Sequence, residues 1–452
     1  MALQEAIHRY HDLLGDELAA DTQAQLDDQQ VRRGLFFGDK PLCTVLRPRF
    51  LTPEMYRFLQ ARVALVMRAF GKAYAAAMDD PVFRKQFGLE GWEEEVIHHD
   101  PQFRDPSPTS RLDAFFISGK GGLKFTEYNA ETPAAPAYND VLSEMFLGLP
   151  AMREFLRTFA VRPLPARHNV MHALVDSFHQ FAGRREAPRV AILDWKEVPT
   201  FSEFVLFRDY FHSQGIECVI ADPREVEYRD GKLMAGDFHV TLIYKRVLIT
   251  ELVQQGGQGL DHPVIRAVRD GAVCMVNPFR CKLLHKKASL AVLSDERNAH
   301  LFTGPELEAI EANIPWTRNL EERRTFHNGQ DVDLLPYVRE NRERMVLKPN
   351  DEYGGKGIVL GWEVDDDAWE AALKTALDSP HIVQERVELP KAPYPSMVDG
   401  KVVLADRMLD TAPFIFHGQY MDGCLTRLST AALLNVTAGG GSSVPTFVVE
   451  RR

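Results

Sequence analysis

The segment Met345–Gly357, MVLKPNDEYGGKG, constrains the fold of this chain more than any other stretch. A short apolar strand carries Lys348, and a loop with three glycines follows it. Glycines let a backbone approach an anion closely, so that its N–H groups can surround phosphate oxygens, and a lysine adds a positive charge. The segment matches neither the Walker A loop nor the dinucleotide-binding fingerprint. On its own it fits a phosphate-binding loop and a glycine-rich hairpin turn about equally well.

Two pairs of polar residues form a second motif. Arg111 and Asp113 lie in one predicted strand, Glu127 and Asn129 lie in the next, and the turn Gly119–Gly122 separates them. Residues two apart share a face of a strand, so a hairpin would bring Asp113, Glu127 and Asn129 together. Carboxylate and amide oxygens suit Mg²⁺, and an arginine beside them would stabilise a transferring phosphoryl group. The alternative is a solvated strand face with an Arg–Asp pair, because surface ion pairs are common.

Two further segments carry weaker signals. Gln384–Val387 leaves an apolar strand and enters a stretch rich in proline, where free backbone groups would meet the edge of an adenine. An ordinary strand end is the alternative. Leu434–Pro445 follows Arg427 and holds the glycine run Gly439–Gly441. Three consecutive glycines suit a mobile loop or an anion-binding nest, and the alternative, a flexible connection near a chain end, is the commoner case.

The pattern of apolar residues divides the chain into three regions. The first hundred residues are predicted to be largely helical, with a clear helix at 52–78, before the strands 111–118 and 123–129 and a helical stretch at 139–181. Strands then alternate with helix in a region that predicts a parallel, Rossmann-like sheet. Its strands are expected at 189–195, 216–221, 240–249 and 272–276, with a helix at 202–213.

The third region holds the glycine-rich segment. Strands are expected at 345–348, 358–360 and 381–384, a helix at 366–377 and hairpin-like strands around Asp399–Lys401. We therefore predict three parts. Residues 1–185 form a helical region plus the metal-binding hairpin, 186–277 the Rossmann-like domain, and 278–452 the nucleotide-binding lobes.

Composition excludes several functional classes. Lys and Arg number 53 against 64 Asp and Glu, a net charge of −11, which disfavours a general nucleic-acid binder. The five cysteines are scattered without a CxxC pair, which predicts neither a disulfide framework nor a zinc ribbon. The N-terminus lacks the apolar core of a signal peptide, and the longest apolar stretch, Phe58–Met78, is interrupted by three basic residues. We expect a cytoplasmic protein without a membrane or nucleic-acid partner, and its oligomeric state stays open.

Taken together, these segments resemble the circularly permuted ATP-grasp family, which includes the synthetase domain of glutathionylspermidine synthetase. LKPNDEYGGKG is similar to the family's phosphate loop, RLD…TEYN to its metal hairpin, and VQERV to its adenine hinge. In ordinary ATP-grasp chains the metal hairpin follows the hinge. Here it precedes the glycine loop by about two hundred residues, which is the permuted order. The resemblance implies an α/β fold with mixed α+β lobes: a circularly permuted ATP-grasp fold with a Rossmann-like pre-ATP-grasp domain.

The resemblance also implies roles for residues of this chain. Asp113, Glu127 and Asn129 would hold Mg²⁺, and Arg111 and Arg427 would contact the reacting phosphoryl group. The residues expected to bind ATP are Lys287, Lys348, Gly354, Gly355, Lys356, Gly357, Gln384, Glu385, Arg386 and Val387. Either Lys286 or Lys287 fits the nucleotide contact, and Lys287 is preferred because Lys287-Ala288 best matches the family's Lys-Ala helix start.

The implied function is that of an ATP-dependent carboxylate–amine ligase, which would form an amide through an acyl phosphate and release ADP and phosphate. Its substrates would be small or peptide-like acids and amines. Two alternatives stay open: a nucleotide-binding regulatory or scaffold protein without turnover, and a phosphotransferase on the same fold. The chain is too short for an appended amidase domain beside a complete synthetase. Its C-terminal LNVTAGGGSSVPTFVV differs from the spermidine-specific enzymes and is similar to an uncharacterised bacterial branch, so the sequence does not name the acid or the amine.

Overall fold

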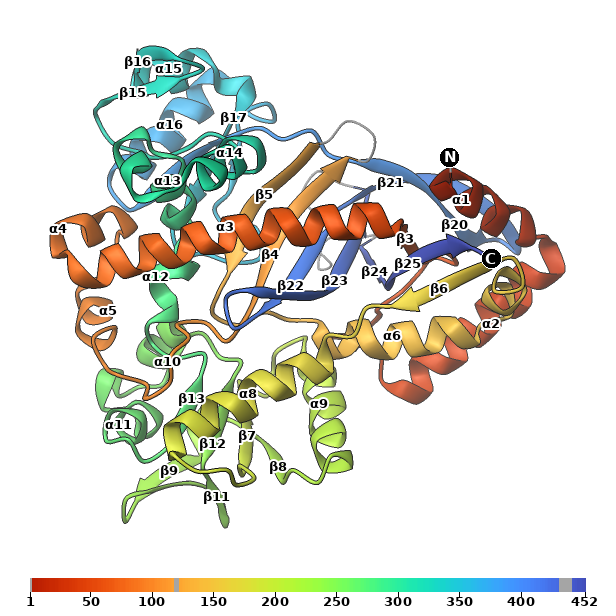
Figure 1. Cartoon of the computed structure of the whole chain (residues 1–452), viewed down its shortest axis with the longest axis horizontal. Coiled ribbons are helices and arrows are strands. Elements are labelled where there is room, and N and C mark those ends of the chain that lie inside the picture. Colours follow the sequence, from red (N-terminus) through yellow and green to blue (C-terminus); the bar gives the residue numbers. More distant parts are fainter. Residues whose placement is uncertain (1, 118–121, 431–440) are drawn as a thin grey trace.

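The computed structural model describes residues 2–117, 122–430 and 441–452 (Figure 1). Most of the predicted turn Gly119–Gly122 and most of the predicted loop Leu434–Pro445 therefore lie outside the described residues. Within the described ranges, no helix combines the length and the apolar character needed to cross a membrane.

Helices dominate the first hundred residues, as predicted. The long helix α3 (Pro53–Asp79) starts at a proline, and the Thr52 hydroxyl caps it by accepting a hydrogen bond from the N–H of Met55 at 3.3 Å. The helix packs on the central sheet, where the rings of Phe70 and Tyr128 lie 4.6 Å apart. The other elements here are α1 (Ala2–Leu13), α2 (Asp16–Arg33), β1 (Phe36–Phe37), β2 (Lys40–Pro41), β3 (Arg49–Leu51), α4 (Pro81–Arg84), η1 (Lys85–Phe87) and α5 (Gly91–Val96).

The central sheet combines strands from two distant parts of the chain. β4 (Thr109–Ile117) and β5 (Gly122–Asn129) form the predicted antiparallel pair, with Arg111 opposite Asn129 and Asp113 opposite Glu127. The sheet continues from β4 through β22 (Ala412–Phe416), β23 (Tyr420–Ser429), β21 (Lys401–Leu409) and β20 (Lys391–Val398), and β24 (Ser442–Val444) also pairs with β23. The first and third predicted parts thus share one sheet, whereas the boundaries at residues 185 and 277 stay a prediction.

The stretch 139–181, predicted to be helical, is helical only in part. It contains α6 (Pro136–Gly148), α7 (Pro150–Phe155) and α8 (Arg167–Ala182), but β6 (Phe159–Pro163) interrupts them. β6 pairs with the C-terminal strand β25 (Thr446–Arg451), which also pairs with β3. The prediction was wrong there because a partner strand far along the chain decides the conformation of this segment, and local pattern does not reveal such a partner.

A parallel four-stranded sheet forms the predicted Rossmann-like region. β8 (Cys218–Ala221), β7 (Val190–Leu193), β12 (Leu242–Lys245) and β13 (Cys274–Val276) pair in that order. The strand predicted at 240–249 ends at Lys245, because α10 (Ile249–Gln255) starts where the N–H of Ile249 donates to the Glu131 carboxylate at 2.6 Å. The region also contains α9 (Phe201–Ser213), η2 (Pro223–Glu225), β9 (Val226–Arg229), β10 (Lys232–Ala235), β11 (Phe238–Val240), η3 (Gly259–Asp261) and α11 (Pro263–Arg269).

A smaller antiparallel sheet carries Lys348. Its strand order is β14 (Thr317–Asn319), β19 (His381–Glu385), β17 (Met345–Pro349) and β18 (Val359–Leu360). The helix α16 (Asp366–Leu377) coincides with the predicted helix, and its Trp369 is buried in a core that belongs to this small lobe. The remaining elements are α12 (Cys281–His285), α13 (Ala288–Ser294), η4 (Glu296–Leu301), α14 (Gly304–Asn313), β15 (Arg324–His327), β16 (Gln330–Asp333), α15 (Leu334–Glu340) and η5 (Arg342–Arg344).

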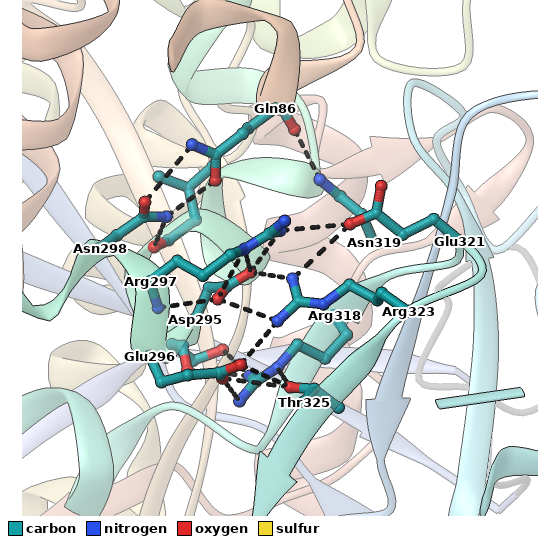
Figure 2. Close-up of polar contacts among 12 residues, drawn as sticks. Gln86, Asp295, Glu296, Arg297, Asn298, Arg318, Asn319, Glu321, Arg323 and Thr325 are labelled. Atoms are coloured by element: carbon teal, nitrogen blue, oxygen red, sulfur yellow. Dashed lines mark hydrogen bonds and ion pairs between the residues drawn. The ribbon is translucent and has the colours of Figure 1, made fainter. Parts of the chain in front are cut away.

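A network of charges joins the small lobe to the rest of the molecule (Figure 2). Arg323 donates to Asp295 at 2.5 Å and to Glu296 at 2.6 Å, and Arg318 of β14 donates to Glu296 at 2.7 Å. Asp295 and Glu296 follow α13, which packs in the same core as α3, whereas the sheet of the small lobe has its own core. The network is therefore one of the contacts that hold the lobe carrying Lys348 in position.

Candidate functional site

A large cavity brings most of the predicted site residues together. Its volume is about 1480 Å³, and its walls come from the central sheet, the Rossmann-like region and the small lobe. Pockets for one small molecule usually measure about 300–1,000 Å³, so this one has room for a nucleotide and a second ligand. The predicted residues that line it are Arg111, Asp113, Glu127, Asn129, Lys348, Gly354, Gly355, Gln384, Glu385, Arg386, Val387 and Arg427. Lys287, Lys356 and Gly357 lie outside its lining.

Asp113 holds two arginines at the cavity wall. Arg111 donates to both carboxylate oxygens, at 2.6 and 3.1 Å, and Arg427 donates to one of them at 2.7 Å. Burial alone would raise the pKa of Asp113, but the two guanidinium groups outweigh burial and lower the pKa well below its usual range. Asp410, which is 2% exposed, fixes Arg427 from its other side at 2.5 Å. The sequence predicted the two arginines and Asp113 but missed Asp410, whose position depends on how distant strands pair.

Glu127 and Asn129 lie beside Asp113 on the neighbouring strand. Glu127 Oε1 lies 3.0 Å from Lys287 Nζ, and Asn129 Nδ2 donates to Asp113 at 3.3 Å. Burial raises the pKa of Glu127, but the charges of Lys287 and Lys348 and the hydrogen bond from Lys287 together outweigh burial, and the pKa is lowered overall. Both carboxyl groups are thus ionised near neutral pH.

The oxygen donors of this hairpin fit Mg²⁺ in one specific way. Across residues 2–117, 122–430 and 441–452, no three His, Cys, Asp or Glu side chains gather as a metal-binding cluster. Asp113 and Glu127 supply only two carboxylates, with an amide oxygen from Asn129. Mg²⁺ is commonly held by one or two carboxylates together with substrate phosphates and water. The donor set therefore fits a magnesium ion that arrives with a nucleotide, and it does not form a complete cage of protein ligands.

Lys348 places a cation in the same cavity. Its Nζ donates to Gln384 Oε1 at 2.7 Å and to the carbonyl oxygen of Thr126 at 3.2 Å. Gln384 in turn donates to Thr317 Oγ1 at 3.0 Å, so the position of the lysine is fixed by a chain of hydrogen bonds. Burial lowers the pKa of Lys348 to about 8, and the charge of Lys287 contributes to the shift.

The glycine-rich loop is anchored at its base. Asp351 accepts a hydrogen bond from Lys282 at 2.7 Å and lies 3.0 Å from Lys286 Nζ. Lys286 thus belongs to this anchor, whereas Lys287 reaches Glu127 at the site. The geometry supports the preference for Lys287 over Lys286, although Lys287 contacts the site from outside the cavity lining.

The glycines of the loop adopt backbone conformations that favour glycine. Gly354, Gly355 and Gly357 have φ angles of 66°, 81° and 71°. A Cβ atom on Gly357 would lie 2.7 Å from Cγ of Pro349, so a larger residue would collide there. Lys356 between them is exposed and pairs with Glu352 at 3.2 Å. The loop therefore has the local geometry expected of a phosphate-binding loop, and its contact with phosphate stays a prediction.

An apolar slot lies beside Gln384–Val387. The side chains that line it are Val346, Ile358, Leu360 and Trp362, and the guanidinium of Arg386 lies 4.1 Å from the ring centre of Trp362. The N–H of Arg386 donates to the carbonyl oxygen of Arg344 at 2.7 Å. For Arg386, the expectation of a free backbone N–H is therefore wrong, because this residue still follows the pairing of β19. Apolar side chains next to a strand end suit a purine ring.

Several charged residues around the site have no signal in the sequence motifs. Glu131 is fully buried and pairs with Lys245 at 3.1 Å and Lys282 at 3.4 Å. Glu131 lies two residues after Asn129 and continues the alternation of the hairpin, and this spacing could have pointed to it as a site residue. Arg47 and Arg49 line the cavity from the N-terminal region, which no motif marked. Of the predicted glycine nest at 439–441, the first two residues lie outside the described part of the chain.

Comparisons with known proteins relate this chain to one family. The model of one family, circularly permuted ATP-grasp type 2, matches residues 127–429. An uncharacterised protein of Mycobacterium tuberculosis is 24% identical over 349 residues, which cover 74% of this chain and 59% of that protein. A protein of Frankia casuarinae, named provisionally as glutamate–cysteine ligase 2-2, is 24% identical over an alignment 486 residues long. The alignment covers 99% of this chain and 52% of that protein. The chain thus spans little more than half the length of these relatives.

A solved structure shows the same fold. A glutathione synthetase-like effector from Globodera pallida matches with a TM-score of 0.62 at 14% identity. The match covers 96% of this chain and 98% of the effector. At this identity the likeness concerns the fold alone.

Proposed function

Because the chain belongs to the circularly permuted ATP-grasp type 2 family, we propose that it is an ATP-dependent carboxylate–amine ligase. The resemblance and the fold class inferred from the motifs are confirmed by the family match and by the structural likeness. The observation that carries the proposal is the arrangement of Arg111 and Arg427 on Asp113, in one cavity with Glu127 and Lys348.

The proposed reaction has two steps. An oxygen of the substrate carboxylate attacks the γ-phosphorus of ATP, the bond to the bridging oxygen breaks, and ADP leaves. The amine of the second substrate then attacks the acyl carbon, phosphate leaves, and the amine loses a proton. Negative charge gathers on the phosphoryl oxygens in both steps, so fixed cations aimed at these oxygens lower the barrier.

The arginines and Lys348 supply these cations. Arg111 and Arg427 keep their charge at every ordinary pH, and Asp113 and Asp410 hold them in place, so little reorganisation is needed during the reaction. Lys348 is positioned by Gln384 to contact the phosphates of the nucleotide. The apolar slot beside Gln384–Val387 would receive the adenine.

Asp113, Glu127 and Asn129 would hold Mg²⁺, which would neutralise phosphate charge when bound. Asp113 already accepts hydrogen bonds from two arginines. We therefore expect Glu127 and Asn129 to contribute most to binding the metal ion. The glycine-rich loop, anchored through Asp351, would cover the phosphates and exclude water from the acyl phosphate.

The test is ADP release with pools of acids and amines, measured in wild type and in Glu127→Ala. We expect release that needs both an acid and an amine, and we expect the variant to lose about two orders of magnitude or more. Glu340→Ala, which removes an exposed carboxylate on α15, is the matched control and should behave as wild type.

Other results would select the alternatives. A stable phosphorylated product without amide would indicate a phosphotransferase. Mg·ATP binding with no turnover on any pool would indicate a regulatory or scaffold protein. Full activity in Glu127→Ala would exclude the proposed site. Hydroxylamine, which converts an acyl phosphate to a hydroxamate, gives a direct readout of the proposed intermediate.

A further inference from the structure

Two arginines at one end of the cavity are buried without an acidic partner. Arg47 is 1% exposed, Arg49 is 7% exposed, and both line the cavity. Across the described part of the chain neither forms an ion pair, and Nε of Arg47 and Nη1 of Arg49 have no hydrogen-bond partner. Arg47 donates only to the carbonyl oxygens of Pro48 and Pro393, both at 3.0 Å, and its guanidinium stacks 4.0 Å above the ring of Tyr394.

The other buried arginines provide a comparison within the same molecule. Each contacts a carboxylate: Arg84 with Glu94, Arg111 with Asp113, Arg246 with Glu203 and Arg318 with Glu296. A charge removed from water is unfavourable unless it is paired and hydrogen-bonded. Arg47 and Arg49 depart from the rule that the rest of this chain follows, and both face a cavity that can admit a ligand.

The polar atoms around the two arginines are also unsatisfied. The hydroxyl groups of Tyr10 and Tyr394 are buried without a hydrogen-bond partner in the described structure. Burial lowers the pKa of Arg47, and the nearby charge of Arg49 acts in the same direction. Two guanidinium groups and the hydroxyl of Tyr394, all of which line the cavity, thus offer hydrogen-bond donors to a ligand there, which is the chemistry of an anion site.

This end of the cavity is distinct from the part predicted to bind the nucleotide. Arg49 lies on β3 and Tyr394 on β20, and these strands lie with α1 near the N-terminus, far from the small lobe that carries Lys348 (Figure 1). The side chains that line this end besides the arginines are mostly apolar: Leu3, Ile7, Phe37 and Phe50. A ligand that fits here carries an anionic group on an apolar or peptide-like stem.

We propose that Arg47 and Arg49 bind a carboxylate that does not react, so that one substrate of the ligase carries a carboxylate beyond the groups joined in the amide. This inference deepens the proposed function and rests on it, since it assigns the carboxylate to a substrate of the same cavity. A guanidinium binds carboxylate in a planar, two-pronged geometry, and two guanidiniums around one carboxylate leave it fully paired. The proposal narrows the substrate class to dicarboxylic acids, amino acids or peptides with a free C-terminus.

The first experiment measures thermal unfolding of the full chain with small probes. Glutarate and N-acetylglycine carry the carboxylate, and glutaramide and N-acetylglycinamide are their uncharged counterparts, all at constant ionic strength. We expect the carboxylates to raise the unfolding temperature of wild type and the amides to leave it unchanged. In Arg47→Met and Arg49→Met the dissociation constant of each carboxylate should rise about ten- to a hundredfold. Arg9→Met, which removes an exposed arginine of α1, should bind them as wild type does.

The stability of the ligand-free variants separates a binding site from a structural role. Removing an unpaired buried charge should leave the unfolding temperature of Arg47→Met and Arg49→Met equal to or above that of wild type. Arg318→Met, which removes one of the two arginines that pair with Glu296, should lower it. If either methionine variant fails to fold, the lysine variant at the same position replaces it in the test. Lysine keeps the positive charge but lacks the planar guanidinium, so this variant should fold and should bind the carboxylates more weakly.

Three results would overturn the proposal. In the first, the carboxylates raise the unfolding temperature of wild type no more than their amides do. In the second, the carboxylates still raise the unfolding temperature of both methionine variants. In the third, inorganic phosphate binds at this end more tightly than the carboxylates. Mg·ATP keeps this test separate from the proposed function: its stabilising effect should persist in Arg47→Met and Arg49→Met. If Mg·ATP stabilises no form of the protein while the carboxylates do, the ligase proposal fails and the anion site stands.

Discussion

Lys348 is a cation whose charge changes within the pH range of ordinary buffers. Its amino group is buried at the site with Lys287 nearby, and its pKa falls to about 8. Desolvation disfavours the charged form, whereas a bound phosphate would favour it. The residue expected to contact the nucleotide therefore changes its charge as the pH passes about 8.

The affinity for Mg·ATP should accordingly depend on pH through Lys348. Above pH 8 the free protein loses the proton that the complex needs, so the dissociation constant should rise about tenfold for each further pH unit. Below that pH the charge is present and this contribution should be flat. Isothermal titration between pH 7 and 9.5 measures it. Lys348→Arg, which stays charged throughout, is the control, and an equal slope in both proteins would contradict the prediction.

Single residues also show how far sequence reasoning reaches. Arg111, Asp113, Glu127 and Asn129 could be placed together because alternation within a hairpin is a local rule. Asp410 could not, because it meets Arg427 only through strand register in the assembled sheet. Positions that depend on local spacing were predictable, and positions that depend on partners from another strand were not.

At the scale of the element, the network around Asp295 helps to hold the small lobe against the rest of the molecule (Figure 2). Burial alone would raise the pKa of this carboxyl, but hydrogen bonds from Arg323 and Arg297 outweigh burial and lower it to about 2. A carboxyl whose pKa is lower in the folded state stabilises that state above its unfolded pKa of about 3.9. The stabilisation is then lost as the pH falls toward 2.

Asp295→Asn should therefore destabilise the small lobe by about 2 kcal/mol at pH 7. The difference from wild type should shrink as the pH falls from about 4 to about 2, because wild type then loses the same charge. Urea unfolding, followed by the fluorescence of Trp316 and Trp369 in this lobe, measures both effects. Asp366→Asn, whose side chain is 90% exposed, should change stability by less than about 0.5 kcal/mol. A constant difference at every pH would count against the network.

The elements themselves were predicted unevenly. The helix α16 and the antiparallel pair of β4 and β5 have strong local patterns, and both are confirmed. The segment Phe159–Pro163 is a strand only because β25 pairs with it, and nothing near it in the sequence shows that partner. Local sequence pattern determines α16 and the pair of β4 and β5, whereas pairing with a distant strand determines β6.

At the scale of the whole molecule, nucleotide binding should be visible as stability. A ligand that binds only the folded state adds about 2.7 kcal/mol when its concentration is a hundred times its dissociation constant. We expect Mg·ATP to raise the unfolding temperature of wild type and to have little effect on Lys348→Met. ATP with EDTA should stabilise less than Mg·ATP, since Glu127 and Asn129 would lack their ion. Equal shifts for wild type and Lys348→Met would remove Lys348 from the nucleotide site.

The place of β25 has a consequence for how the chain is made. This strand lies between β3 and β6 in the sheet. During translation, β3 and β6 are therefore synthesised long before the strand that pairs with both of them, which begins at Thr446. At a synthesis rate of about 5–20 residues per second, β25 is made roughly 15–60 s after β6 and roughly 20–80 s after β3. During this interval the unpaired edges of β3 and β6 can pair with wrong strands. We expect chaperones that bind nascent chains to matter most for folding in this interval. The sheet of β3, β25 and β6 therefore cannot close until Thr446–Arg451 have been synthesised.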